Sequence, residues 1–173
     1  MRWIAVPLIV VSAPAYAVQY LSVQQAQAAL FAPGTRFAPR PLELGDAQAQ
    51  AIEQASGQRV RSRRPEIWQA FEGERPAGWL FVDQVIGKHE FITYALALGA
   101  DGAVRGIEVM DYRETYGGEI RNASWRRQFA GKRQGDALKL GRDIRNITGA
   151  TLSCRNVTNG VKRLLALYAL VLK

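Results

Sequence analysis

Two threonines flank a glycine and an alanine near the C-terminus, at Thr148, Gly149, Ala150 and Thr151. The segment is small and rich in hydroxyl groups, and it contains no strong acid or base. An amphipathic helix is expected directly after it, with Ser153 as a good N-cap. The N–H groups and partial positive charge at a helix N-terminus bind phosphate, which would place Thr151 beside a phosphate site.

The chemistry open to Thr151 is limited but specific. A threonine hydroxyl is no redox group, yet it can carry one through a phosphoester. Gly149 permits a tight, left-handed turn that would present Thr151 outward. On the residues alone, a helix-capping loop with weak affinity for anions is the simpler interpretation, and the attachment site is the alternative.

The central element that must position this loop is an antiparallel sheet. From Ile67 to Tyr112 the sequence alternates with period two and is rich in β-branched and aromatic residues, which predicts strands. The predicted strands are residues 67–73, 78–87, 90–99 and 103–112, separated by turns at 74–78, 87–90 and 100–103. The pair Asp101-Gly102 is a strong hairpin signal. About four strands flanked by helices give an α+β fold class.

Four helices are predicted around this sheet. Apolar spacing and caps place them at residues 22–31 with Ser22 as N-cap, 45–57 with Asp46 as N-cap and Gly57 as stop, 122–131, and from about Ser153 to the C-terminus. The third buries Trp125 and Phe129, which are four residues apart. The last lines one face with residues 157, 161, 164, 165, 168 and 172, and is expected to pack on the sheet.

The N-terminal segment resembles an export signal. Arg2 precedes an apolar run from Trp3 to Val11, and Ala15-Tyr16-Ala17 forms an A-x-A cleavage pattern. The run is shorter than the roughly 20 residues that span a bilayer. We therefore expect a secretory signal at 1–17, a helical segment with a linker at 18–66 and the main domain at 67–173. The expected location is the periplasm or cell envelope, with an N-terminal anchor as the alternative if the signal is not cleaved.

Composition restricts the classes of function. The 173 residues carry a net charge of +8, but their basic residues are scattered apart from the run at 59–64, and no nucleic-acid-binding signature accompanies them. That run is a solvated face or a docking site for an acidic partner or an anionic membrane surface. A single histidine, His89, argues against a multi-histidine metal or haem site, and Cys154 has no partner for an internal disulfide.

Two motifs, in order, resemble the FMN-binding domain family. The first is the sequence TGATLS before an apolar helix. The second is the stretch YRETYGGEI followed by WRRQFAGK, which is similar to an E-T-P-G-like loop and a W-x-x-Q-F helix. The matching residues of the second motif are Glu114, Thr115, Gly117, Trp125, Gln128 and Phe129. The family includes the flavin subunits of the sodium-translocating NADH:quinone reductase and of the Rnf complex, along with exported stand-alone flavoproteins.

The resemblance implies a covalent cofactor. In the family, the last threonine of an S/T-G-A-T motif carries FMN through its phosphate, which corresponds to Thr151 here. The implied flavin site is formed by Thr148, Gly149, Ala150, Thr151, Leu152 and Ser153 together with Glu114, Thr115 and Gly117. The isoalloxazine is expected to lie against the loop at 114–118, where glycines let the ring approach the backbone closely. Arg155 or Lys162 is expected to help neutralise the phosphate.

This sequence differs from the family pattern at two positions. Tyr116 stands where proline is common, and Arg145 stands where an acidic residue is often found, six positions before the modified threonine. That acid is thought to help a flavin transferase recognise its target. Asp143, two positions before Arg145, is the alternative residue for that role.

No nucleophile–base pair or carboxylate dyad is evident, so we expect an electron carrier rather than an enzyme. Its expected partners are a flavin transferase and a membrane-bound redox protein. One alternative is a non-redox module that binds anions or phosphate reversibly. The other is a flavin reductase domain with a small acceptor of its own.

Overall fold

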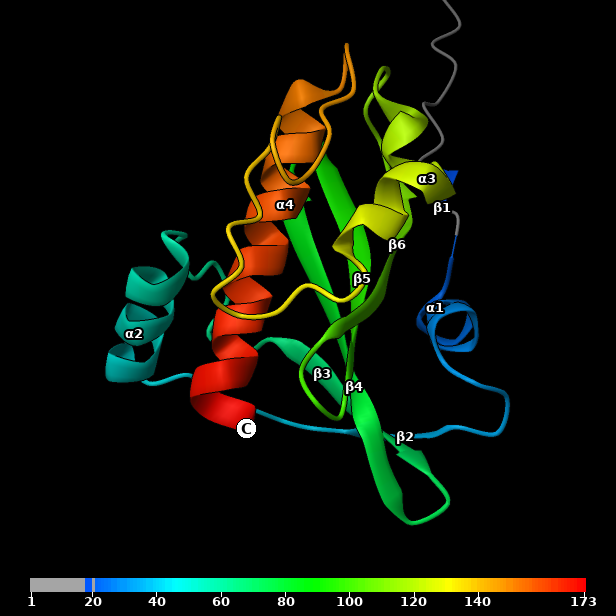
Figure 1. The fold of residues 1–173 in the computed structure, drawn as a ribbon, viewed down its shortest axis with the longest axis vertical. Coiled ribbons are helices and arrows are strands. Elements are labelled where there is room, and N and C mark those ends of the chain that lie inside the picture. The colour runs from blue at the N-terminus through cyan, green and yellow to red at the C-terminus, as the bar shows by residue number, and fades with distance from the viewer. Residues whose placement is uncertain (1–17, 20) are drawn as a thin grey trace, which may run out of the picture.

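Six strands among residues 18–19 and 21–173 form one antiparallel sheet (Figure 1). The computed structural model describes these residues, so the expected export signal at 1–17 lies outside the described part. The strands are β1 (Val18–Gln19), β2 (Arg36–Pro39), β3 (Glu66–Glu72), β4 (Arg75–Ile86), β5 (Phe91–Gly99) and β6 (Val104–Tyr112). Their order across the sheet is β1-β6-β5-β4-β3-β2.

The α+β fold and its central antiparallel sheet are confirmed. The four expected strands correspond to β3–β6, each paired with its neighbour in sequence. Asp101-Gly102 forms the turn between β5 and β6, with Gly102 in the left-handed region at φ +78°. The expected turn at 74–78 is shorter than predicted, because β4 already begins at Arg75. Two short edge strands, β1 and β2, complete the sheet. Each of them pairs with a strand that is far away in the sequence, β1 with β6 and β2 with β3.

The helices begin and end close to their predicted positions. They are α1 (Val23–Leu30), α2 (Asp46–Ser56), α3 (Ala123–Arg126) and α4 (Thr151–Leu167), with 3₁₀ turns η1 (Gly118–Arg121) and η2 (Arg127–Phe129) and a terminal π-helical turn η3 (Tyr168–Leu172). Ser22 caps α1 with a capping box, as expected. Two cap predictions are wrong: Gly45 rather than Asp46 precedes α2, and Ala150 rather than Ser153 precedes α4.

Helices cover both faces of the sheet (Figure 1). The larger core cluster joins one face to α4 and α2, and it includes the expected α4 residues Val157, Val161, Leu164 and Leu165. Trp125 and Phe129 belong to the same cluster, with ring centroids 5.1 Å apart. A smaller cluster joins the other face to α1. In the part of the chain that the structure describes, no helix has the length and apolar character needed to cross a membrane.

A buried polar network ties α4 to the sheet. Asp83 Oδ2 accepts hydrogen bonds from Tyr94 Oη and from Arg163 Nη2, both at 2.6 Å. Burial, and then the neighbouring Asp83 carboxylate, raise the pKa of Tyr94 well above its usual value. Gly160 makes room for this tyrosine, because a Cβ there would lie 2.2 Å from Tyr94 Oη.

We therefore expect Gly160→Ala to lower the free energy of unfolding, by about 1–3 kcal/mol, as overpacking of a core does. The hydroxyl is held by Asp83 and cannot move aside without losing that bond. Urea denaturation measures the change. Asn159→Ala in the same helix is the control, expected to stay within about 0.5 kcal/mol. Greater stability of Gly160→Ala would contradict the expectation, and Tyr94→Phe should restore part of the loss.

Candidate functional site

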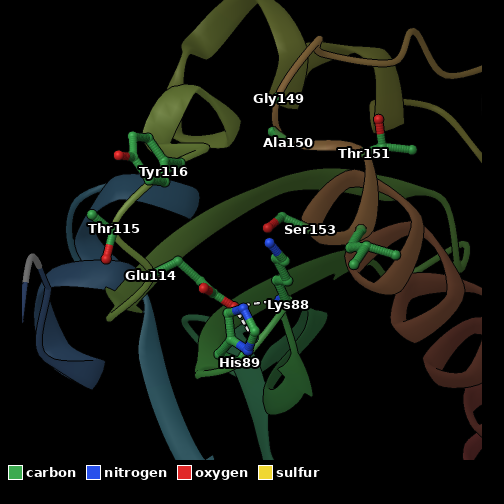
Figure 2. Close-up of a pocket in the computed structure, with 10 residues that line it drawn as sticks. Lys88, His89, Glu114, Thr115, Tyr116, Gly149, Ala150, Thr151 and Ser153 are labelled. Atoms are coloured by element: carbon green, nitrogen blue, oxygen red, sulfur yellow. Dashed lines mark hydrogen bonds between the residues drawn. The ribbon is translucent and has the colours of Figure 1, made fainter.

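A cavity of about 550 Å³ lies between the start of α4, the loop after β6 and the β4–β5 turn. Its volume falls in the range of small-molecule sites, roughly 300–1,000 Å³. Figure 2 shows Thr115 and Tyr116 on one side and Thr151 and Ser153 on the other. The lining residues are Lys88, His89, Glu114, Thr115, Tyr116, Gly149, Ala150, Thr151, Leu152 and Ser153.

The structure brings the predicted site residues together, although they come from two motifs separated by about thirty positions. Seven of the nine line this cavity. The remaining two, Thr148 and Gly117, line an adjoining hollow of about 390 Å³ that shares Thr115, Tyr116 and Gly149 with the first. Sequence reasoning did not assign Lys88 to the site, because its place depends on the folding of the β4–β5 hairpin against the loop after β6.

The start of α4 provides unpaired backbone donors. Thr151 is the first helical residue, and Ala150 at the N-cap forms no side-chain cap bond. The first N–H groups of a helix have no intrahelical acceptor. Those of Thr151, Leu152 and Ser153 are therefore available to an anion, supported by the positive end of the helix. Gly149, at φ +86°, makes the left-handed turn that leads into the helix, as predicted.

Ser153 has a different role from the cap that was expected. Because α4 begins two residues earlier, its side chain points inward and is buried. Its hydroxyl lies 3.4 Å from Tyr112 Oη, which also donates a hydrogen bond to the carbonyl oxygen of Tyr116. Partial burial raises the pKa of Tyr112, so its hydroxyl stays protonated and remains a donor at neutral pH. This contact links α4 to the loop after β6.

Glu114 attaches the loop after β6 to the β4–β5 turn. Its Oε1 accepts hydrogen bonds from the backbone N–H groups of Lys88 and His89 (Figure 2). The same oxygen accepts the N–H of Glu90 at 3.0 Å. Partial burial opposes ionisation of this carboxyl, but the three donors outweigh it and hold the pKa of Glu114 below its ordinary value. Gly87 permits this approach, because a Cβ there would lie 2.5 Å from the same oxygen.

We expect Glu114→Gln to reduce the free energy of unfolding by about 1–2 kcal/mol at neutral pH, because a neutral acceptor binds the three N–H groups less strongly. The lowered pKa means that the carboxylate stabilises the fold above its ordinary pKa of 4.5 and loses this effect as the pH falls through the folded-state value. Denaturant unfolding of both proteins from pH 7 to pH 3 should show the difference shrinking.

The exposed Glu119, in the 3₁₀ turn η1 directly after this loop, supplies the control for this prediction. Glu119→Gln is expected to change stability by less than about 0.5 kcal/mol at every pH. A difference between wild type and Glu114→Gln that stays constant down to pH 3 would show that ionised Glu114 does not hold the loop.

The two motifs are in direct contact at Gly117. This residue has φ +90°, and a Cβ on it would lie 2.7 Å from Tyr112 Oη and 3.0 Å from Ala150 Cβ. The glycine was expected to allow a flavin ring to approach the backbone. The structure gives a second reason for a glycine at this position, because the missing side chain lets the loop after β6 pack against the loop before α4.

The Trp125–Gln128 pair holds the chain that leads to Thr151. Trp125 Nε1 donates to the carbonyl oxygen of Arg145, and the N–H of Arg145 donates to Gln128 Oε1, both at 2.8 Å. Gln128 Nε2 donates to the carbonyl oxygen of Trp125 at 3.0 Å, which orients its amide. Two positions of the W-x-x-Q-F motif therefore fix one residue of the distant attachment segment, besides the packing role expected for Trp125.

The other ionisable residues near the site have simpler roles. Arg155 is exposed one turn into α4, whereas Lys162 lines a separate small hollow beside α2, so of the two only Arg155 is near Thr151. Cys154 is fully buried, and burial raises the pKa of its thiol. His89 is exposed in the turn held by Glu114. No group of three or more His, Cys, Asp or Glu residues suited to a metal ion occurs in the described ranges.

Comparison with known families bears directly on this cavity. The profile described as FMN-binding domain matches residues 87–166, which include the β4–β5 turn, the loop after β6 and most of α4. Residues 87–166 are an FMN-binding domain. The matched segment thus contains both motifs and every residue that lines the cavity. No curated protein matches the chain.

The residues of this FMN-binding domain suit the cofactor that its family binds. The start of α4 offers N–H groups for a phosphate, and Lys88 and Arg155 add positive charge nearby. The cavity is large enough for a ring system and has the side chains of Tyr116 and Leu152 at its wall. FMN supplies hydride and single-electron chemistry when bound, and the protein controls its orientation and access.

Proposed function

We propose that this protein is an exported electron carrier that holds FMN through a phosphoester to Thr151. The observation that carries the proposal is the position of Thr151: it is the first residue of α4, lies beside unpaired N–H groups and lines the cavity. The FMN-binding domain match supports the cofactor. A covalent link prevents the flavin from dissociating. This matters outside the cytoplasm, because a cofactor released there would be lost.

The exposure of the site supports the proposed electron-transfer role. Tyr116 is 82% exposed and Leu152 is 41% exposed at the cavity wall, so a bound flavin would be reachable by another protein. The proposed partners are a flavin transferase, a membrane-bound reductase and an acceptor outside the cytoplasm.

The basic run at residues 59–64 is a proposed docking site for an acidic partner or an anionic membrane surface. Arg63 and Arg64 pair with Asp46 and Glu43 of the same chain, and all four side chains are at least 47% exposed. Such exposed pairs are weak, about 0–1 kcal/mol, so an anionic partner can compete for the arginines.

The test is the intact mass of the full chain after co-expression with a flavin transferase in a host that exports it. We expect a yellow protein whose denatured mass has lost residues 1–17 and gained one FMN less one water. Peptide mapping should place the gain on the segment containing Thr151. Flavin that is fully released by denaturation would overturn the covalent link, and a colourless protein would overturn the flavoprotein assignment as well.

A further inference from the structure

We infer that Asn146 is a positioning residue for flavin attachment, which fixes the orientation of the Thr151 hydroxyl. This inference rests on the proposed covalent link. Asn146 Nδ2 donates a hydrogen bond to Thr151 Oγ1 at 2.9 Å, across the intervening turn. In Figure 2 the Thr151 hydroxyl points away from Lys88 and Ser153. Thr148, Gly149 and Asn146 are exposed, so an enzyme can reach this side.

Asn146 is itself held in place by its neighbour. The N–H and the carbonyl oxygen of Arg145 are both bound by the Trp125–Gln128 pair, at 2.8 Å each. The turn between Asn146 and Thr151 is closed by the N–H of Ala150, which donates to the carbonyl oxygen of Ile147 at 3.0 Å. Hydrogen bonds therefore connect Trp125 and Gln128 to Arg145, and Asn146, the next residue in the chain, to the Thr151 hydroxyl.

The bond from Asn146 restricts the hydroxyl without blocking it. An amide donor occupies one lone pair of Oγ1 and leaves the other lone pair and the proton free. In the transfer step, Oγ1 attacks the flavin-side phosphorus of a flavin dinucleotide. The Oγ1–P bond forms, the phosphoanhydride P–O bond breaks, adenylate leaves, and the hydroxyl proton passes to a base of the transferase. Holding a nucleophile in one orientation lowers the entropic part of such a barrier.

Two other residues near this position, Arg145 and Asp143, form no hydrogen bond with the Thr151 hydroxyl in the described part of the chain. Arg145 occupies the position where an acid would otherwise help recognition of the target, and the nearby Asp143 accepts the N–H of Lys139 at 3.0 Å. Asp143 therefore stabilises its own turn. Among the described residues, the side chain that contacts Thr151 Oγ1 is Asn146.

The test compares wild type with Asn146→Leu, which keeps the side-chain size and removes the donor. The apo proteins are mixed with purified transferase and flavin dinucleotide, and attachment is followed by intact mass. We expect the maximal rate to fall about five- to tenfold, the equivalent of one hydrogen bond. The KM for the dinucleotide, the final extent and the melting temperature should stay unchanged. Asn159→Ala is the control and should attach flavin at the wild-type rate.

A second readout needs no transferase. Three-bond NMR couplings of a labelled Thr151 should report one χ1 rotamer in wild type and averaged rotamers in Asn146→Leu. Unchanged couplings, an unchanged attachment rate, or a rate that falls only together with the melting temperature would each overturn the inference. If wild type acquires no flavin at all, the proposed covalent function fails instead, while the coupling measurement still tests the contact between Asn146 and Thr151.

Discussion

Thr151→Ala is expected to eliminate covalent flavin completely, whereas Thr151→Ser should retain it. The reason is chemical, because a phosphoester needs a hydroxyl at the start of α4 and alanine has none. The hydrogen bond that the Thr151 hydroxyl accepts from Asn146 is exposed, so the loss of this hydroxyl should leave the fold intact. The measurement is the intact mass of each denatured protein after co-expression with a flavin transferase, together with its flavin fluorescence.

Two further variants show whether the position, rather than the residue type, decides attachment. Thr148 lies three residues earlier and is exposed, and Cys154 is buried three residues later. Thr148→Ala and Cys154→Ser should each carry as much covalent flavin as wild type. Covalent flavin that persists in Thr151→Ala but disappears in Thr148→Ala would move the attachment point to the exposed hollow beside Thr148.

Gly117→Ala is expected to damage both stability and flavin loading, because it separates the two motifs. The new Cβ would lie 2.7 Å from Tyr112 Oη and 3.0 Å from Ala150 Cβ, at a φ of +90° that L side chains rarely adopt. Overpacking and backbone strain of this kind each cost about 1–3 kcal/mol. Urea denaturation should therefore show a decrease of at least about 2 kcal/mol in the free energy of unfolding. Covalent flavin per protein should also fall.

The neighbouring glycine provides a matched control for this experiment. Gly118 has no positive φ, and a Cβ there would have Arg121 side-chain atoms at 3.8 Å as its nearest neighbours. Gly118→Ala should therefore change stability by less than about 0.5 kcal/mol and load flavin normally. Equal losses in both variants would mean that the loop needs flexibility in general and not a contact between Gly117 and Ala150.

Local patterns predicted the elements of this fold well, because they depend on neighbours in sequence. Period-two alternation identified the strands β3–β6, and the spacing of apolar residues identified α4 and its buried face. The two cap errors have one cause. Ser153 and Asp46 are good capping residues, but cap positions depend on where the backbone leaves the preceding turn, which the residue types alone do not determine.

The sequence by itself determined the chemistry available to this protein. A hydroxyl before an apolar helix made a phosphoester possible, and the resemblance of two motifs in order to the FMN-binding domain family predicted such a domain, which the match to residues 87–166 confirms. Only the tertiary structure decided how these parts work together. It placed Lys88 at the cavity, turned Glu114 toward the β4–β5 turn and directed Asn146 to Thr151. Most of these contacts join residues far apart in the chain, and periodicity and spacing cannot predict such contacts. The contact between Asn146 and Thr151 is local, but it depends on how the turn between them folds.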